Sequence, residues 1–229
     1  MKKRIGGFIF LFFTLVSYSQ AQEFQREWAF GANAGATLSK ISFNPGVPQD
    51  FLIQQEGGLT LRYISEKNFG IQLELNYSLR GWKEQVDTVV HPNQYSRSLA
   101  YLELPLMTHI YFDMGKRARM VFNLGPQIGY NLSEKVLQRI IVSPPGEVPG
   151  YYGKTAEQES GYKVQNKFDY GLAGGMGIEV RTGIGSFILE GRYYFGLSDV
   201  FNNEKKDYFQ ASSNQVIGIK LSYLFQIKN

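Results

Sequence analysis

The chain has 229 residues, no cysteine and a formal net charge of +4, with 43% hydrophobic and 19% charged residues. Without cysteine it can form neither a disulfide scaffold nor a thiolate site, so a packed sheet or a membrane must stabilise it. The sequence lacks the sustained lysine and arginine excess that a nucleic-acid partner requires, and we expect none.

The first residues have the three parts of a secretory signal peptide. Three cations at residues 2–4 precede an uncharged apolar run at residues 5–16, and small and polar residues follow. We expect cleavage after Ala21, which removes residues 1–21 and lowers the net charge to about +1. The run is shorter than the roughly 20 residues of a membrane-spanning helix, so an uncleaved anchor is the less favoured alternative. Residues 22–229 contain no linker and are expected to form one domain.

Eight segments then alternate between apolar and polar residues with the two-residue period of a β-strand. In the segment IQLELNYSLR, residues 71–80, the odd-numbered residues are Ile, Leu, Leu, Tyr and Leu, and the even-numbered ones are Gln, Glu, Asn, Ser and Arg. Each segment is long enough to cross a bilayer as a tilted strand, which takes roughly 9 to 11 residues. The eight predicted strands span residues 28–38, 54–64, 71–80, 99–112, 119–132, 168–180, 186–196 and 215–227.

The connections between these strands alternate in length. Long connections at residues 39–53, 83–98, 133–167 and 197–214 are separated by short ones at residues 65–68, 113–118 and 181–185. Transmembrane barrels show this alternation because their periplasmic turns are tight and their extracellular loops are long. A soluble sandwich has no reason to sort its loops in this way. The sequence therefore predicts an all-β fold, an eight-stranded antiparallel up-and-down transmembrane β-barrel in the cell outer membrane.

The two faces of the predicted strands differ in charge. The apolar face carries no charged residue, as expected for a face in lipid, where a charge costs roughly 2–4 kcal/mol at the midplane. The other face mixes charges with glycines, which suit the inside of a narrow barrel where side chains converge. These inner glycines are Gly31, Gly35, Gly58, Gly125, Gly129, Gly171, Gly175, Gly177 and Gly218. Aromatic residues near the strand ends are assigned to interfacial girdles: Trp28, Tyr63, Trp82, Phe112, Tyr130, Phe168, Tyr170, Phe195 and Phe225.

Titratable residues of both signs fall on the predicted inner face. An eight-stranded barrel is just wide enough for side chains to fill it, and buried charges persist only when they are paired. We therefore expect a lumen charge network that plugs the barrel, with a proton or ion path as the less favoured alternative. Its predicted members are Glu56, Arg62, Glu74, Arg80, Glu103, His109, Asp169, Glu179, Glu190, Arg192 and Lys220.

The sequence offers little to support catalysis. His91 lies in a predicted loop near Glu84 and Asp87, but a lone histidine without a nucleophile motif indicates a solvated residue. The glycine-rich GLAGGMG at residues 171–177 lies within a predicted strand and opens no helix, which excludes a phosphate-binding role. We expect neither catalysis nor a cofactor nor a bound metal.

The longest connection, residues 133–167, is the best functional candidate by size. Its Tyr151, Tyr152 and Tyr162 are candidates for contacting a partner. An unengaged loop is the alternative, and VLQRIIVS within it could continue the barrel wall beyond the membrane.

Pro105 lacks an N–H group inside a strand paired on both sides, so we expect a bulge or kink there.

Several strands together resemble a known family. LELNYSLRGW, YLELPLMTHIYF, VFNLGPQIGYNL, FDYGLAGGMGIEV, FILEGRYYFGLSDV and IGIKLSYLF resemble the outer-membrane β-barrel domain of PorT-like proteins, over roughly residues 28–225. The resemblance implies a Gram-negative cell envelope, and some members of that family belong to a secretion and gliding machinery.

The function expected from these observations is non-enzymatic. A monomeric barrel in contact with outer-membrane lipid would anchor extracellular loops for structural or interaction roles, with other envelope proteins as candidate partners. A component of an envelope secretion assembly and an enzyme active at the extracellular rim are the alternatives.

Overall fold

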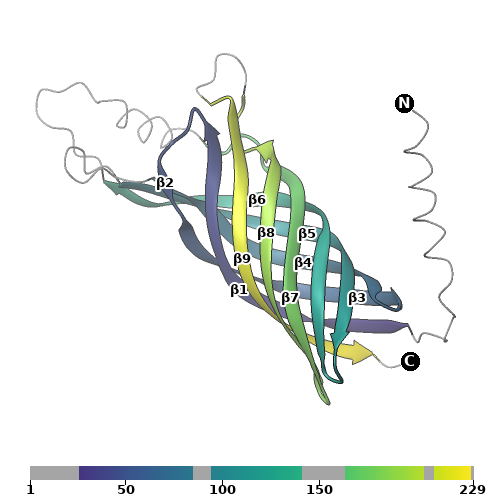
Figure 1. Ribbon diagram of the computed structural model, residues 1–229. Coiled ribbons are helices and arrows are strands. Elements are labelled where there is room, and N and C mark those ends of the chain that lie inside the picture. Colours follow the sequence, from purple (N-terminus) through teal and green to yellow (C-terminus); the bar gives the residue numbers. More distant parts are fainter. Residues whose placement is uncertain (1–25, 85–93, 141–162, 204–208, 228–229) are drawn as a thin grey trace, which may run out of the picture.

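The structure, a computed structural model, describes residues 26–84, 94–140, 163–203 and 209–227. No helix in these ranges is long and apolar enough to cross a membrane. Strands dominate them (Figure 1): β1 (Glu27–Asn44), β2 (Gln49–Asp50), β3 (Leu52–Glu66), β4 (Phe69–Glu84), β5 (Gln94–Met114), β6 (Ala118–Ile140), β7 (Phe168–Thr182), β8 (Gly185–Asp199) and β9 (Ala211–Ile227).

The eight long strands form a closed antiparallel ring. Each pairs with the long strands before and after it in the sequence, and the ring closes where β1 pairs with β9, from Trp28–Ile227 to Asn44–Ala211. The short β2 pairs only with the end of β4. The predicted eight-stranded up-and-down barrel is confirmed, and each predicted strand lies within one of the long strands.

The two ends of the barrel are built differently (Figure 1). Short turns at residues 67–68, 115–117 and 183–184 lie at one end, together with the start of β1 and the end of β9. We call this the turn end, and the opposite end, with the longer connections, the loop end. The strands reach further toward the loop end than expected, because β1 continues to Asn44 and β6 to Ile140. Parts of the predicted long connections 39–53 and 133–167 are therefore strand.

The longer strands reflect a change of pattern near the loop end. Along most of β1 the outer face is apolar, with Trp28 and Phe30 exposed. Beyond Leu38 the alternation continues with its polarity reversed, since Ile41 and Phe43 are buried inside and Ser42 is exposed outside. A prediction that requires an apolar outer face ends the strand at this reversal, which is why the predicted strand 28–38 is shorter than β1.

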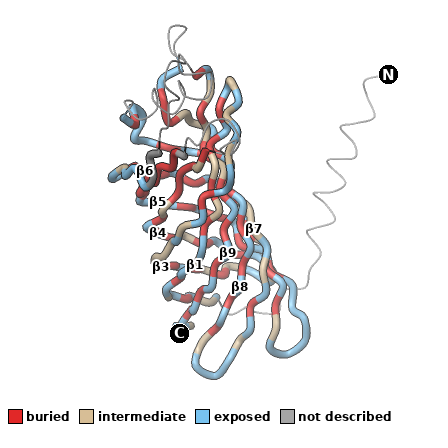
Figure 2. The backbone as a smooth tube through the Cα atoms, turned by 90° about the vertical axis from the view of Figure 1, so that its left-hand side faces the viewer, coloured by how far each residue is buried: buried red, intermediate tan, exposed pale blue. Residues whose placement is uncertain are grey.

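Burial alternates along the strands, as Figure 2 shows. In β4, Leu75 and Tyr77 are 45% and 49% exposed on the outer face, while Glu74 and Asn76 are each 1% exposed inside. The inward and outward faces predicted for residues 71–80 are confirmed. The outer face of residues 71–79 meets the requirement for lipid contact, because its side chains are apolar and uncharged.

Most of the inner glycines have a different cause from the one expected. A Cβ added to Gly31 or Gly125 would lie 1.7 Å or 2.1 Å from a carbonyl oxygen of the neighbouring strand. Glycine at these positions therefore allows close approach of two backbones. Side-chain convergence is the reason at Gly129, where a Cβ would lie 3.0 Å from a guanidinium nitrogen of Arg80, and at Gly175, where it would lie 2.5 Å from a carboxylate oxygen of Glu190.

Pro105 interrupts the ladder without a bulge. Between β4 and β5, pairing stops after Leu73–Leu106 and resumes at Asn76–Glu103 in the same register. Of the expected bulge or kink at Pro105, the bulge is wrong, because a missing N–H group removes a ladder hydrogen bond without inserting a residue. The kink stays a prediction. The register shifts of β5 with β6 lie nearer the start of β5.

Candidate functional site

The barrel lumen holds all eleven residues of the predicted charge network. Ten of them are buried, and the Glu56 side chain is 8% exposed. Strand alternation points these side chains into the lumen. Which of them form ion pairs depends on their positions along the barrel axis. The side chains form three polar layers, which we describe from the turn end upward.

The layer nearest the turn end pairs Arg62 of β3 with Glu179 of β7 through two hydrogen bonds of 3.1 and 2.8 Å. The His109 ring lies beside this pair, with Nε2 at 3.3 Å from the Arg62 guanidinium and Nδ1 at 2.8 Å from Asn123 Oδ1. A guanidinium only donates, so Nε2 accepts and Nδ1–H donates to the Asn123 amide oxygen. Both ring nitrogens of a neutral His109 are thereby engaged in the fold.

The middle layer is centred on Glu74 of β4. The Arg192 guanidinium donates to both its oxygens at 2.8 and 2.9 Å, and the Lys220 ammonium donates at 2.9 Å. Side-chain amides two residues before and after Glu74 donate to it as well, at 2.7 and 2.8 Å. Arg192 also binds Glu190 at 2.8 Å. Such a bidentate, charge-assisted arrangement fixes the side chains of three strands relative to one another.

The layer toward the loop end is centred on Arg80. Its guanidinium lies 2.8 Å from Asp169 and 3.5 Å from Glu103, and it stacks 3.7 Å from the centre of the Tyr101 ring. The Tyr194 hydroxyl donates to Asp169 at 2.8 Å. The contacts join strands β4, β5, β7 and β8 across the lumen.

A small cavity separates the middle layer from this one. It has a volume of about 20 Å³, and Glu56, Glu103, Arg80 and Arg192 are among its lining residues. This is room for about one water molecule. The cavity is too small to join the layers into a continuous water path.

An apolar cluster closes the lumen above the polar layers. We call it the loop-end plug, and its buried residues come from β1, β4, β5 and the segments before β7 and after β8. Trp82 is fully buried in it, with ring centres 5.7 Å from Phe43 and 6.1 Å from Phe201. The plug consists of Ile41, Phe43, Trp82, Tyr95, Leu99, Tyr101, Val164, Val200, Phe201 and Phe209.

The structure corrects the assignment of Trp82 to an interfacial girdle. Trp82 lies two residues after the inward-facing Arg80, so the period of the strand already placed it inside. Residue type alone misplaces Trp82, because the inner face turns apolar where the strand approaches the loop end. The buried Arg119, which binds Asp113 at 2.9 Å and stacks on Tyr111 at the turn end, was missed as well. It begins the predicted strand 119–132, where the same period would have placed it inside.

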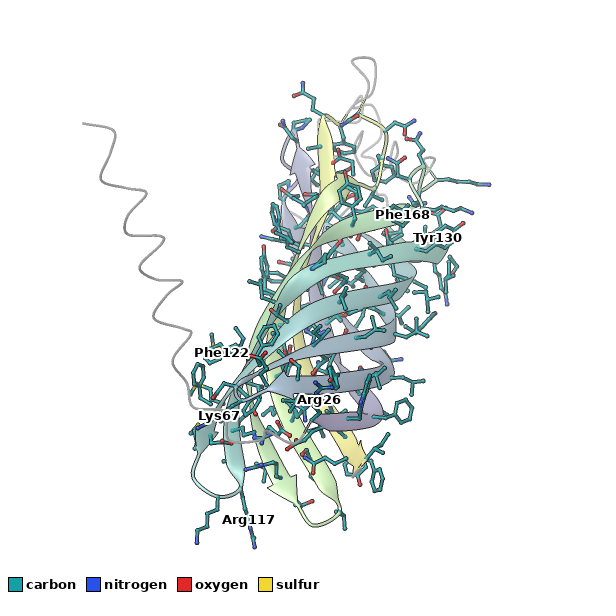
Figure 3. The ribbon with its side chains drawn as sticks, turned by 90° about the vertical axis from the view of Figure 1, so that its right-hand side faces the viewer. Arg26, Lys67, Arg117, Phe122, Tyr130 and Phe168 are labelled. Carbon is teal, nitrogen blue, oxygen red and sulfur yellow. The ribbon has the colours of Figure 1, made fainter. Side chains whose placement is uncertain are left out.

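Several aromatic residues of the outer face lie toward the two ends of the barrel. Figure 3 shows Tyr130 and Phe168 together toward the loop end, where β6 and β7 pair at these two residues. Phe122 lies toward the turn end in the same view, with the exposed Lys67 and Arg117 beyond it. This order of aromatic and charged side chains is typical of the boundaries of a membrane.

Several predicted loop residues lie outside the described part of the chain. They are Tyr151, Tyr152, Tyr162, His91 and Asp87. Glu84, the third residue of the group around His91, is described and is buried at the end of β4. In the described ranges no group of three or more His, Cys, Asp or Glu side chains is placed to hold a metal ion.

Comparison with known proteins gives a family. No curated protein matches the sequence. Among solved structures, the chain is similar to Ail, the attachment invasion locus protein of Yersinia pestis, whose structure was solved in complex with the heparin analogue sucrose octasulfate. The two are 13% identical over 87% of this chain and 99% of that one, with a TM-score of 0.40. It is similar to OprG from Pseudomonas aeruginosa, with 12% identity over 87% and 95% of the two chains and a TM-score of 0.47. It is also similar to Neisserial surface protein A, with 9% identity over 87% of this chain and 99% of that one and a TM-score of 0.46.

The sequence match carries the assignment. Residues 20–202 match the family model described as "Outer membrane protein beta-barrel domain", which is well over half of the chain. Together with the closed eight-stranded ring, this places the protein in the outer membrane. The chain belongs to the outer membrane protein beta-barrel domain family.

Proposed function

We propose that the protein is a non-enzymatic, monomeric barrel with a closed lumen, and that it presents its loop end to binding partners. The observation that carries this proposal is the filling of the lumen, with three layers of paired charges below the loop-end plug. Eight strands leave room for little more than side chains. A substrate has no route to the inner histidine and carboxylates, so these residues support the fold and interaction falls to the outer surface.

The loop end is the favoured surface for interaction. Loops on a rigid scaffold commonly carry binding, and this barrel has its longer connections at one end. We propose that residues 1–21 are a signal peptide removed on export, so that residues 22–229 form the mature barrel. The candidate contacts Tyr151, Tyr152 and Tyr162 fall between β6 and β7 in the sequence.

The alternative is a role in an envelope secretion assembly, as the resemblance to PorT-like proteins implies. Co-purification from detergent-solubilised membranes separates the two, because an assembly component would bring the same envelope proteins in a fixed ratio. A barrel that purifies alone from the same membranes would favour the first role.

A first prediction is that the protein forms no wide pore. Planar-bilayer recording of the purified barrel should show no stable, large conductance steps, because both the polar layers and the plug block the lumen. The double variant Trp82→Ala/Phe201→Ala should remain closed too, since the charge layers below the plug stay in place. Large, stable steps from the unmodified protein would contradict the closed lumen.

A second prediction concerns the loop after β6. Replacing residues 141–162 with a short glycine-containing turn should abolish a cellular phenotype of the gene while the barrel still assembles and resists heat in detergent. His91→Ala should leave that phenotype unchanged. Loss of the phenotype with His91→Ala alone would favour the enzyme at the rim over the binding role.

A further inference from the structure

The barrel wall parts between β7 and β8 near the loop end. The β7–β8 ladder ends at Gly171–Gly196. On its other side, β8 leaves the β9 ladder after Phe195 and rejoins it at Asp199 with a shifted register. Leu197 and Ser198 therefore belong to neither ladder. The chain closes again above them, where the Asn166 N–H donates to the carbonyl oxygen of Val200 at 3.2 Å.

An open cavity of about 570 Å³ lies where the strands part. We call it the β7–β8 notch, and residues 165–168, 170, 197–199 and 203 line it. Ser198 spans the gap inside it, since its hydroxyl accepts the Tyr170 N–H at 3.1 Å and donates to Asp169 at 2.5 Å. Its volume falls within the range of small-molecule sites, about 300–1,000 Å³.

The lining of the notch changes from apolar to polar along the barrel axis. Phe168, Tyr170 and Leu197 belong to the outer face and are 54%, 48% and 54% exposed. Beyond them the lining is polar, with Asn166 and Lys167 on one side and Asn203 on the other. Figure 3 places Phe168 toward the loop end of the barrel. A molecule in the notch therefore meets hydrocarbon-compatible surface at one end and water-compatible groups at the other.

One cation, Lys167, and one carboxylate, Asp199, line the polar end of the notch. The carboxylate of Asp199 is already engaged, since it accepts the Ser212 N–H at 2.5 Å and an Asn203 N–H at 3.1 Å. The Asn166 side-chain amide donates to the carbonyl oxygens of Asp199 and Phe201 at 3.0 and 3.4 Å. Lys167 is exposed and forms no ion pair with any residue that the structure describes. Its ammonium is the cation available to an incoming group.

We propose that the β7–β8 notch binds one membrane lipid with an anionic headgroup. Its chains lie against Phe168, Tyr170 and Leu197, and its phosphate lies at Lys167. A lipid is the occupant that matches both ends of the notch, because this outer face is already in contact with the bilayer. A lysine close to a headgroup contributes about 1 kcal/mol, which corresponds to roughly a five-fold change in affinity.

Native mass spectrometry of the detergent-purified barrel tests the proposal, with phosphatidylglycerol or phosphatidylcholine of identical chains added in series. The unmodified protein should bind phosphatidylglycerol more tightly. Lys167→Gln should weaken phosphatidylglycerol binding about five-fold and leave phosphatidylcholine binding unchanged. The matched control is Lys135→Gln, an exposed lysine of β6 outside the notch, which should change neither affinity.

The apolar end is tested by Leu197→Ser, which should weaken binding of both lipids. All three positions are exposed, and heat-modified mobility on gels checks that each variant is assembled. Equal binding of the two lipids by the unmodified protein would overturn the proposal. So would equal losses in Lys167→Gln and Lys135→Gln, which would indicate general attraction to a basic surface. Unchanged binding in Leu197→Ser would overturn it as well.

Discussion

Replacing Glu74 with leucine is expected to lower the free energy of unfolding by about 3–5 kcal/mol, the usual loss when one partner of a buried ion pair is removed. Glu74 accepts hydrogen bonds from Arg192 and Lys220, all three being buried. In the variant Arg192 retains Glu190, but Lys220 retains only Glu56 at 3.7 Å. The Lys220 ammonium would then lose its closest counter-charge, and the donors that Glu74 satisfies would be left buried without an acceptor. Urea unfolding in lipid vesicles measures the change.

Two further variants show whether the charges cause the loss. Glu66→Leu removes an exposed carboxylate at the turn end and should change stability by less than about 0.5 kcal/mol. Adding Lys220→Met to Glu74→Leu should recover much of the lost stability, because it removes the cation left without a close partner. If Glu74→Leu alone were as stable as the unmodified protein, the middle layer would contribute no more than packing does.

The architecture followed from the sequence because one physical rule governs most of the chain. A strand in a bilayer must be apolar on one face, and that rule repeats with a period of two in all eight strands. The alternation of long and short connections then predicts which end of the barrel carries the tight turns and which carries the loops. Burial of Glu74 and Asn76 beside the exposed Leu75 follows directly from this period.

The rule fails where the outer face leaves the lipid. Near the loop ends of β1 and β4 the inner face becomes apolar, so Phe43 and Trp82 are buried in the plug. Phe201 and Phe209 join the plug from a connection, where no alternation marks them. A strand pattern can locate the first two residues once its reversal is noticed, but it carries no information on the last two.

The partners within the lumen depend on the stagger of the strands, which the pattern of residues does not show. Arg62 and Glu179 are 117 residues apart and belong to strands β3 and β7, which do not pair. Their contact is fixed by strand tilt and register around the whole ring. The sequence could predict that these charges face inward and must be paired, but not which carboxylate each cation meets.

Leu75→Arg is expected to impair assembly of the barrel, with a loss of about 2–4 kcal/mol if the side chain lies at the bilayer midplane. Leu75 is near the middle of β4, is 45% exposed on the outer face and pairs with the outward-facing Leu59 of β3. A guanidinium at this position would meet hydrocarbon, where it has no counter-charge. The measurement is the assembled fraction after refolding into phospholipid vesicles, read as heat-modified mobility on gels.

Ser42→Arg is the matched control, because it introduces the same side chain on the same face of the wall at a different height. Ser42 is exposed on the outside of β1 opposite Ser213 of β9, in the part of the strand where the apolar side has moved inward. An arginine there meets water or headgroups, so assembly should match that of the unmodified protein. Equal effects of the two substitutions would mean that the boundary between lipid and water does not lie between these positions.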